Sequence, residues 1–199
     1  MSQENAYKYF AYAISSNVRE RASTAIQEAK KEHSRGFKQF DSGRLLSLYW
    51  VSVLVEEAAR ACRISPVVLD TAWGDMQKQL CVASHLLAVS GSVGKEWSEE
   101  LGRKRKEMAR EKDVLVAGSV RHVKKIYHRF VCMLVDGMKE QLFSMRERER
   151  RAKDTALEDF VSGQVFGLNE IITVIQIDAE RAFKISLEEL KLTDTDMHI

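Results

Sequence analysis

Apolar residues recur every three or four positions along most of the chain, which is the period of an α-helix. At the start of the sequence these positions are Tyr7, Phe10, Ile14, Val18, Ala22, Ala25 and Ala29. They predict a first helix over residues 4–35. Gly36 and the sequence Asp41-Ser42-Gly43 predict its end and a cap for the following helix, because glycine and short polar residues favour helix termini.

The next two segments differ in how much of their surface is apolar. Residues 44–63 are apolar nearly all round, which predicts a central, buried helix. Ser65-Pro66 predicts the start of a third helix, since proline in the first turn loses no hydrogen bond, and this helix is expected to run to Val89. Residues 95–112 keep only a thin apolar stripe that includes Trp97, so we expect this helix to be mostly solvated or covered by a partner.

Two further helices complete the pattern. One is expected from Val120 through the arginine-rich sequence that ends near Lys153. Thr155 and Glu158 have the spacing of a capping box, which predicts the start of a last, acidic helix that ends near Leu190. We therefore predict an all-α protein, an antiparallel bundle of about six helices, several of them long, in a single domain over residues 1–199.

Composition agrees with a helical, globular chain. One proline and ten glycines in 199 residues are too few for the turns of a β-sandwich or barrel. The three cysteines are far apart and form no CxxC pair, so reduced thiols in a cytoplasmic compartment are expected rather than disulfides or zinc ligands. The N-terminus lacks the pattern of a signal peptide, and no window has the ~18–20 uninterrupted apolar residues of a transmembrane segment.

The net charge of the chain is +2, but the charged residues are distributed unevenly along it. Residues 95–153 carry 17 Lys and Arg against 10 Asp and Glu, a net charge of +7. Residues 154–199 carry 3 against 10, a net charge of −7. A basic middle section is therefore followed by an acidic last helix.

Two interpretations of the basic section remain open. In the first, it forms a cationic face that binds nucleic-acid phosphates, an acidic protein or an anionic membrane surface. In the second, the glutamates three and four positions away pair with these bases, and the acidic last helix neutralises the remainder. The candidate nucleic-acid-binding residues are Arg103, Lys104, Arg105, Lys106, Arg110, Lys124, Lys125, Arg129, Arg146, Arg148, Arg150 and Arg151.

Motifs for common chemistries are not found in the sequence. There is no HExxH, no clustered His/Cys spacing, no glycine-rich phosphate loop and no GxSxG, so no metal and no cofactor are expected.

One pair of residues, Arg121 and His128, is nevertheless a candidate catalytic site. Arg121 and His128 are seven residues apart, about two helical turns, so they share one helix face. An imidazole transfers protons near neutral pH and a guanidinium binds phosphate, which together suit metal-free RNA cleavage.

The sequence RHVKKIYH, with Arg121, His122 and His128, resembles the motif of the HEPN ribonuclease superfamily. Those proteins are all-helical and carry an arginine, commonly a polar residue, and a histidine after four to six intervening residues near the start of a late helix. The earlier sequence FDSGRLLSLYWVSVLVEEAARA is also loosely similar to a helix of that family. The resemblance implies a dimer with two motifs facing a cleft, His128 as acid and base, Arg121 as the stabiliser of transition-state charge, and His122 as the polar residue.

From the residues themselves we expect a non-enzymatic interaction or structural subunit of a larger assembly, either a homo-oligomer or bound to a protein partner. Its basic face would contact RNA, DNA or an acidic protein. The thin stripe over 95–112 and the uneven charge motivate this expectation. A HEPN-like ribonuclease is one alternative, and a shell-forming or membrane-surface protein is the other.

Overall fold

The structure is a computed structural model that describes residues 3–31, 35–65, 69, 73–88, 93–103 and 125–193. Within these ranges all regular structure is helical, which confirms the predicted all-α class. The elements are α1 (Gln3–Glu28), α2 (Arg35–Ala61), α3 (Gly74–Ala88), α5 (Ile126–Ala152), α6 (Glu158–Asp178) and the π-helical turn η1 (Ala179–Phe183). Residues 93–103 are also helical.

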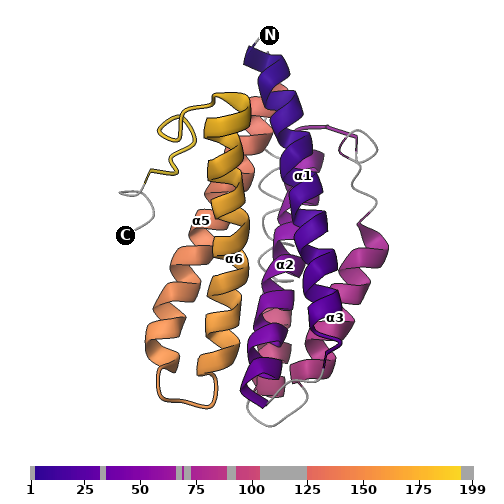
Figure 1. The fold of residues 1–199 in the computed structure, drawn as a ribbon, viewed down its shortest axis with the longest axis vertical. Helices are drawn as coiled ribbons and strands as arrows, with labels where there is room; N and C mark the ends of the chain where they lie inside the picture. Colours follow the sequence, from indigo (N-terminus) through magenta and orange to yellow (C-terminus); the bar gives the residue numbers. More distant parts are fainter. Residues whose placement is uncertain are drawn as a thin grey trace.

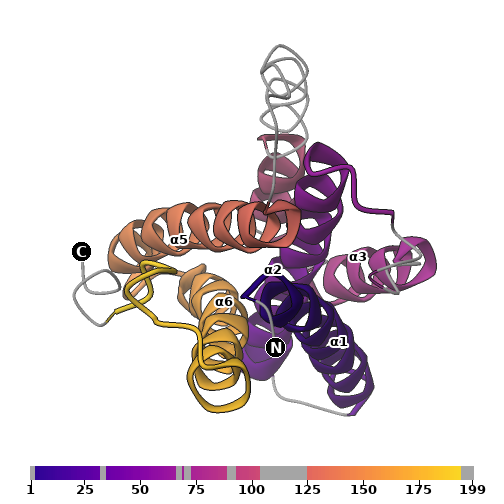
Figure 2. The ribbon, with the colours of Figure 1, turned by 90° about the horizontal axis from the view of Figure 1, so that it is seen from above.

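Helix α2 occupies the middle of the bundle, with the other helices arranged around it (Figures 1 and 2). This position explains why its sequence is apolar on nearly every side. The main hydrophobic core joins α2 to α1, α5 and α6, and includes the fully buried Phe10, Leu48 and Leu134. A second, smaller core lies among α2, residues 93–103 and the start of α6, where Trp50, Trp97 and Phe160 are buried.

The predicted break at Asp41-Ser42-Gly43 is wrong, because α2 already begins at Arg35 and continues through these residues. Gly43 allows two helices to pack closely and does not cap a helix. A Cβ atom at this position would lie 1.9 Å from the Phe160 carbonyl oxygen in α6, and one at Gly163 would lie 2.0 Å from the Phe40 carbonyl oxygen in α2. The two helix backbones can approach this closely only because neither residue has a side chain. Ser47 adds a hydrogen bond from its hydroxyl to the Gln164 carbonyl oxygen, at 2.7 Å.

The last helix also ends earlier than predicted. After α6 and η1 the chain turns at Lys184, whose φ of 55° lies in the left-handed region, and does not continue as a helix to Leu190. Residues 184–193 fold back along the bundle, and Leu190 and Leu192 are buried. The apolar residues that suggested a longer helix therefore reach the core from a non-helical segment.

Three other boundaries need correction. The first helix ends at Glu28 rather than near residue 35, and the third begins at Gly74 rather than at Pro66, which is outside the described residues. Helix α5 begins at Ile126 rather than at Val120, which is also outside the described residues. The capping box does not form as predicted. The Thr155 hydroxyl accepts a hydrogen bond from the Leu157 amide, and the Glu158 carboxylate accepts one from the Asp154 amide.

Candidate functional site

His128, the described member of the predicted Arg-His pair, lies on the first turn of α5 and packs against other side chains. Its ring meets the ring of Tyr7 from α1 edge to face, with the centroids 4.6 Å apart. Its Nε2 atom is 3.5 Å from Cys132 Sγ and 3.4 Å from Glu189 Oε1. The His128 side chain is 29% exposed, so it is only partly accessible to water.

Two neighbours of His128, Tyr7 and Cys132, are held in their neutral forms. Burial, followed by the neighbouring Glu189 carboxylate, raises the pKa of Tyr7 well above its usual value. Burial, followed by the Asp136 and Glu189 carboxylates, raises the pKa of Cys132. A protonated thiol is a poor nucleophile. Because Cys132 and Glu189 both approach the same nitrogen, His128 does not bridge them as the base of a nucleophilic triad would.

Several predicted site residues are outside the described part of the chain, so the structure does not place them beside His128. They are Arg121 and His122 of the motif, together with the basic residues Lys104, Arg105, Lys106, Arg110 and Lys124.

Two of the predicted nucleic-acid-binding residues, Arg103 and Arg148, form salt bridges with carboxylates of the same chain. Arg148 on α5 binds Glu96 and Glu100, with 2.8 Å between Arg148 Nη1 and Glu100 Oε2. Arg103 binds Glu100 as well, at 2.8 Å. The Glu100 side chain is only 2% exposed, so these two guanidinium groups neutralise a buried carboxylate. Arg103 and Glu100 are three positions apart, as the salt-bridged interpretation expects, whereas the carboxylates that bind Arg148 come from a distant segment, residues 93–103.

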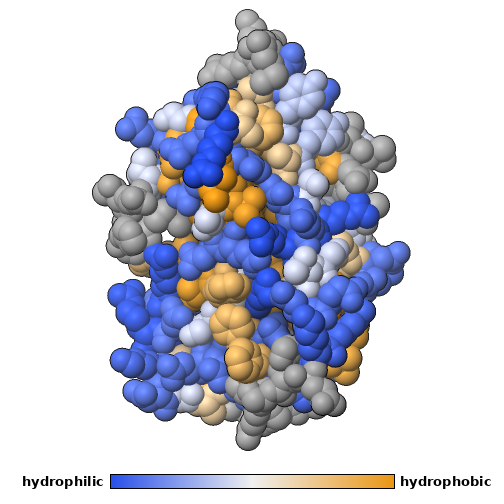
Figure 3. Space-filling model, viewed as in Figure 1, coloured by the Kyte–Doolittle hydropathy of each residue, from blue (hydrophilic) through white to orange (hydrophobic). Residues whose placement is uncertain are grey.

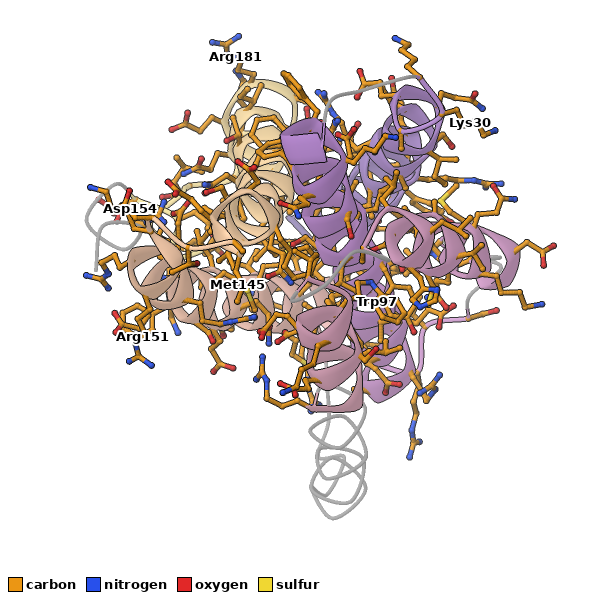
Figure 4. The ribbon with its side chains drawn as sticks, turned by 90° about the horizontal axis from the view of Figure 1, so that it is seen from below. Lys30, Trp97, Met145, Arg151, Asp154 and Arg181 are labelled. Atoms are coloured by element: carbon orange, nitrogen blue, oxygen red, sulfur yellow. The ribbon has the colours of Figure 1, made fainter. Side chains whose placement is uncertain are left out.

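The remaining bases of α5 are more exposed. Arg150 and Arg151 both bind Glu147 on their own helix, each at 2.8 Å. Arg146 contacts Asn169 of α6 at 3.5 Å. Lys125 is exposed and Arg129 is partly buried at the start of α5. Figure 4 shows Arg151 at the outer edge of the bundle and Met145 on the inner side of α5.

A largely buried ion pair between α2 and α6 was not predicted from the sequence. Arg44 of α2 binds Glu170 of α6 through two contacts of 3.0 and 3.1 Å, and it also binds Glu28 of α1 at 2.5 Å. Arg21 adds a third contact to Glu170, at 3.1 Å. A charged residue within each of two strongly apolar helices, Arg44 in one and Glu170 in the other, was the signal that could have predicted this pair.

Aromatic side chains gather at the surface where α2 meets α6. The rings of Phe40 and Phe166 are 5.4 Å apart, and the Arg44 guanidinium lies over the Phe166 ring at 5.4 Å. Phe37 lies one turn before Phe40 and is largely exposed, as is about half of Phe166. We call Phe37, Phe40 and Phe166 the aromatic patch. Figure 3 shows apolar surface below the centre of the view, where α6 and the lower part of α2 face the viewer.

Metal and membrane signals are weak. Among the described residues no group of three or more His, Cys, Asp or Glu side chains is arranged to hold a metal ion. One described helical stretch, Glu158–Phe183, is long and apolar enough to cross a membrane by length and composition, but more than half of its apolar window is buried inside the bundle. Burial of this kind is also typical of a core helix.

No protein-family model, curated protein or solved structure matches this chain. Its function must therefore be inferred from its own geometry.

Proposed function

We propose that the protein is a non-enzymatic helical-bundle subunit that works by binding other macromolecules within a larger assembly. The observation that supports this most is the aromatic patch. Phe40 and Phe166 pack against each other between two helices, and the Arg44 guanidinium lies over the Phe166 ring. Phe37, one turn before Phe40, is largely exposed. Aromatic residues and arginine are the residue types enriched at the centres of protein interfaces.

The surroundings of His128 support a packing role for this side chain. Its Nε2 already has two neighbours, a thiol and a carboxylate, and its ring packs edge to face with Tyr7. A general base needs a nitrogen directed at the substrate proton within hydrogen-bond distance.

The exposed bases of α5 add a charged contact to the proposed function. Arg150 and Arg151 are 69% and 75% exposed and keep donors beyond those that bind Glu147, since each guanidinium has five. An acidic protein surface is the partner class that this mixed Arg/Glu surface suits best, because the alternating glutamates would repel a continuous row of phosphates.

The experiment is site-specific photo-crosslinking in extracts of the cells that make the protein. A photoreactive phenylalanine analogue replaces Phe37 or Phe166 in the full chain, and a matched chain carries it at Lys78, an exposed position of α3. The proposal predicts the same discrete crosslinked species from positions 37 and 166, absent from position 78 and lost when Phe40→Ser is added. Equal crosslinking at all three positions, or none at the patch, would contradict it.

A further inference from the structure

The chain that follows α6 contains two residues in an unfavourable backbone conformation. Lys184 comes directly after the π-helical turn η1 and has a φ of 55°, and Lys191 has a φ of 53°. Both values lie in the left-handed region, where a residue with a side chain is less stable than glycine. We call residues 184–193 the C-terminal segment, and Figure 1 shows it in yellow at the end of α6.

The second of these residues occupies a position where glycine is usual. The Leu192 amide donates a hydrogen bond to the Leu187 carbonyl oxygen at 2.8 Å, and the Lys191 amide donates one to the Glu188 carbonyl oxygen at 3.0 Å. This pair of bonds is that of a Schellman motif, in which glycine usually occupies the left-handed position. The folded-back segment therefore carries an unfavourable φ at both of its turns.

The same residues also have the spacing of a continued α6. Ile175 and Ala179 lie on the buried side of α6 and η1. Steps of four, four and three residues lead from Ala179 to Phe183, Leu187 and Leu190, which is the helical period. Figure 2 looks down on this end of the bundle and shows no other described helix in front of the end of α6, so a continued helix has room.

Burial of apolar side chains holds the segment in its folded-back form. The side chains concerned are Ile185, Leu190 and Leu192. The charged contacts add less. Glu189 Oε1 lies 3.4 Å from His128 Nε2, and Lys191 Nζ lies 3.8 Å from Asp136 Oδ1. All four of these side chains are at least 29% exposed, and contacts between charged groups at such positions contribute little to stability.

We propose that the C-terminal segment is a latch with two states. In the closed state it folds back, as in the structure, and Glu189 lies against His128. In the open state Lys184 takes a helical φ, α6 continues through Leu190, and Glu189 leaves His128. Apolar burial makes the closed state the major one, whereas release of the unfavourable φ values favours the open state.

The latch controls access to the side chains around His128. Burial, then the carboxylates of Asp136 and Glu189, raise the pKa of the Cys132 thiol in the closed state. Opening removes Glu189 and exposes this face of α5, so the thiol ionises more readily and reacts faster. Cys81 is also partly buried, but it packs against the second core and serves as an internal control.

The latch does not depend on the proposed function, because it uses no residue of the aromatic patch. Failure of the crosslinking at Phe37 and Phe166 would leave it standing. Failure of the latch would likewise leave the crosslinking result standing.

The first test compares two substitutions at the exposed position 184 in the full chain. Lys184→Gly should favour the closed state, since glycine tolerates a positive φ and is unfavourable within a helix. Lys184→Val should favour the open state, because a β-branched residue is strongly disfavoured at positive φ. The rate at which a maleimide labels Cys132, measured by mass spectrometry of its peptide, should be lowest for Lys184→Gly and highest for Lys184→Val, with at least ~5-fold between them.

The labelling rate of Cys81 should be the same in all three proteins. Equal rates at Cys132 in the natural chain and both variants would overturn the latch. An equal rise at Cys81 and Cys132 in Lys184→Val would also overturn it, because the variant would then be loosening the whole bundle.

The second test measures the distance between spin labels on ketone-bearing residues that replace Thr173 and Thr193, so the natural cysteines remain. In the closed state the labels are close, because the Leu192 carbonyl oxygen accepts a hydrogen bond from the Gln176 side chain at 2.8 Å. A helix from Thr173 through Leu190 is about 25 Å long, so the open state gives a second, longer distance. This distance should gain population in Lys184→Val and lose it in Lys184→Gly. A single short distance in all three proteins would overturn the proposal, as would a broad distribution without the longer distance.

Discussion

Arg44 and Glu170 form a two-contact ion pair between α2 and α6, with side chains that are only 11% and 10% exposed. The first experiment therefore removes one partner. Arg44→Met should lower the free energy of unfolding by about 3 kcal/mol, because it leaves the Glu170 carboxylate largely buried with only the Arg21 pair. Urea denaturation measures this loss.

The matched control for this pair is the double variant Arg44→Met with Glu170→Leu. It should be more stable than Arg44→Met alone, since no buried charge is left without its partner. If the double variant is instead the less stable of the two, the ion pair is not what makes the single substitution costly.

Gly163→Ala should strongly destabilise the contact between α2 and α6. The added methyl group would lie 2.0 Å from the Phe40 carbonyl oxygen, so the helices must move apart, at a cost of about 3 kcal/mol. Gly102→Ala is the control, because nothing lies within 4 Å of its added Cβ, and it should be neutral or stabilising by ~0.5–1 kcal/mol. Thermal denaturation compares the two, and equal effects would rule out close packing as the reason for Gly163.

Arg148→Ala should reduce stability rather than nucleic-acid affinity. It removes one of the two guanidinium groups that neutralise the buried Glu100, at a cost of about 2 kcal/mol, while Arg151→Ala on the surface should change stability by less than ~0.5 kcal/mol. Measuring RNA or DNA binding at several salt concentrations completes the test. A decrease of ~1 in the salt slope for Arg148→Ala would show that this residue binds a phosphate instead.

His128→Ala should leave RNA as intact as the natural chain does. Purified proteins are incubated with unstructured RNA in EDTA and the products are separated by gel electrophoresis. The reason is that the Nε2 atom faces Cys132 and Glu189 within its own chain. Cleavage by the natural chain that is lost in both His128→Ala and Arg121→Ala would instead favour the HEPN-like ribonuclease.

Cys62 should make the protein less stable in alkaline solution. Burial raises the pKa of its thiol from 9.0 to about 11. Below pH 9 the thiol is protonated in both the folded and the unfolded chain. As the pH rises from about 9 to about 11 the unfolded chain loses this proton first, so unfolding becomes easier.

The measurement for Cys62 is the urea midpoint as a function of pH. Cys62→Ala should show a shallower decline over the same range, because only the thiols and phenols that remain, Cys132 and Tyr7 among them, still contribute. A decline of equal slope in both proteins would exclude Cys62 as a source of the effect.

The fold class was predictable because helical periodicity reports directly on which positions are buried, as Phe10, Ile14 and Val18 are. The role of Gly43 was not predictable in the same way. Glycine both ends helices and permits close helix contacts, and only the presence of Gly163 in a distant helix decides between the two. The predicted helix end at Leu190 was wrong for a similar reason, since the sequence alone does not distinguish an apolar residue buried by a folded-back segment from one buried on a helix face.

For the candidate site, the sequence indicated which residues are charged but not which carboxylates they meet. Glu100 belongs to a polar, arginine-rich segment, yet it is buried because two arginines cover it. His128 has the spacing of a catalytic motif, but Tyr7 and Glu189, which surround it, come from opposite ends of the chain. Such pairings depend on tertiary structure, which the local sequence does not contain.

The central position of α2 also has a consequence for the order of folding during synthesis. The Arg44–Glu170 ion pair cannot form until Glu170, 126 residues later in the chain, has been synthesised. The close contact at Gly43 likewise requires α6, which contains Gly163. Contacts of such long sequence separation slow folding, because a large chain loop must close before they form. On the ribosome the central helix of the bundle therefore stays without its principal neighbour until nearly the whole chain has emerged, and α2 is the segment that we expect chaperones to protect.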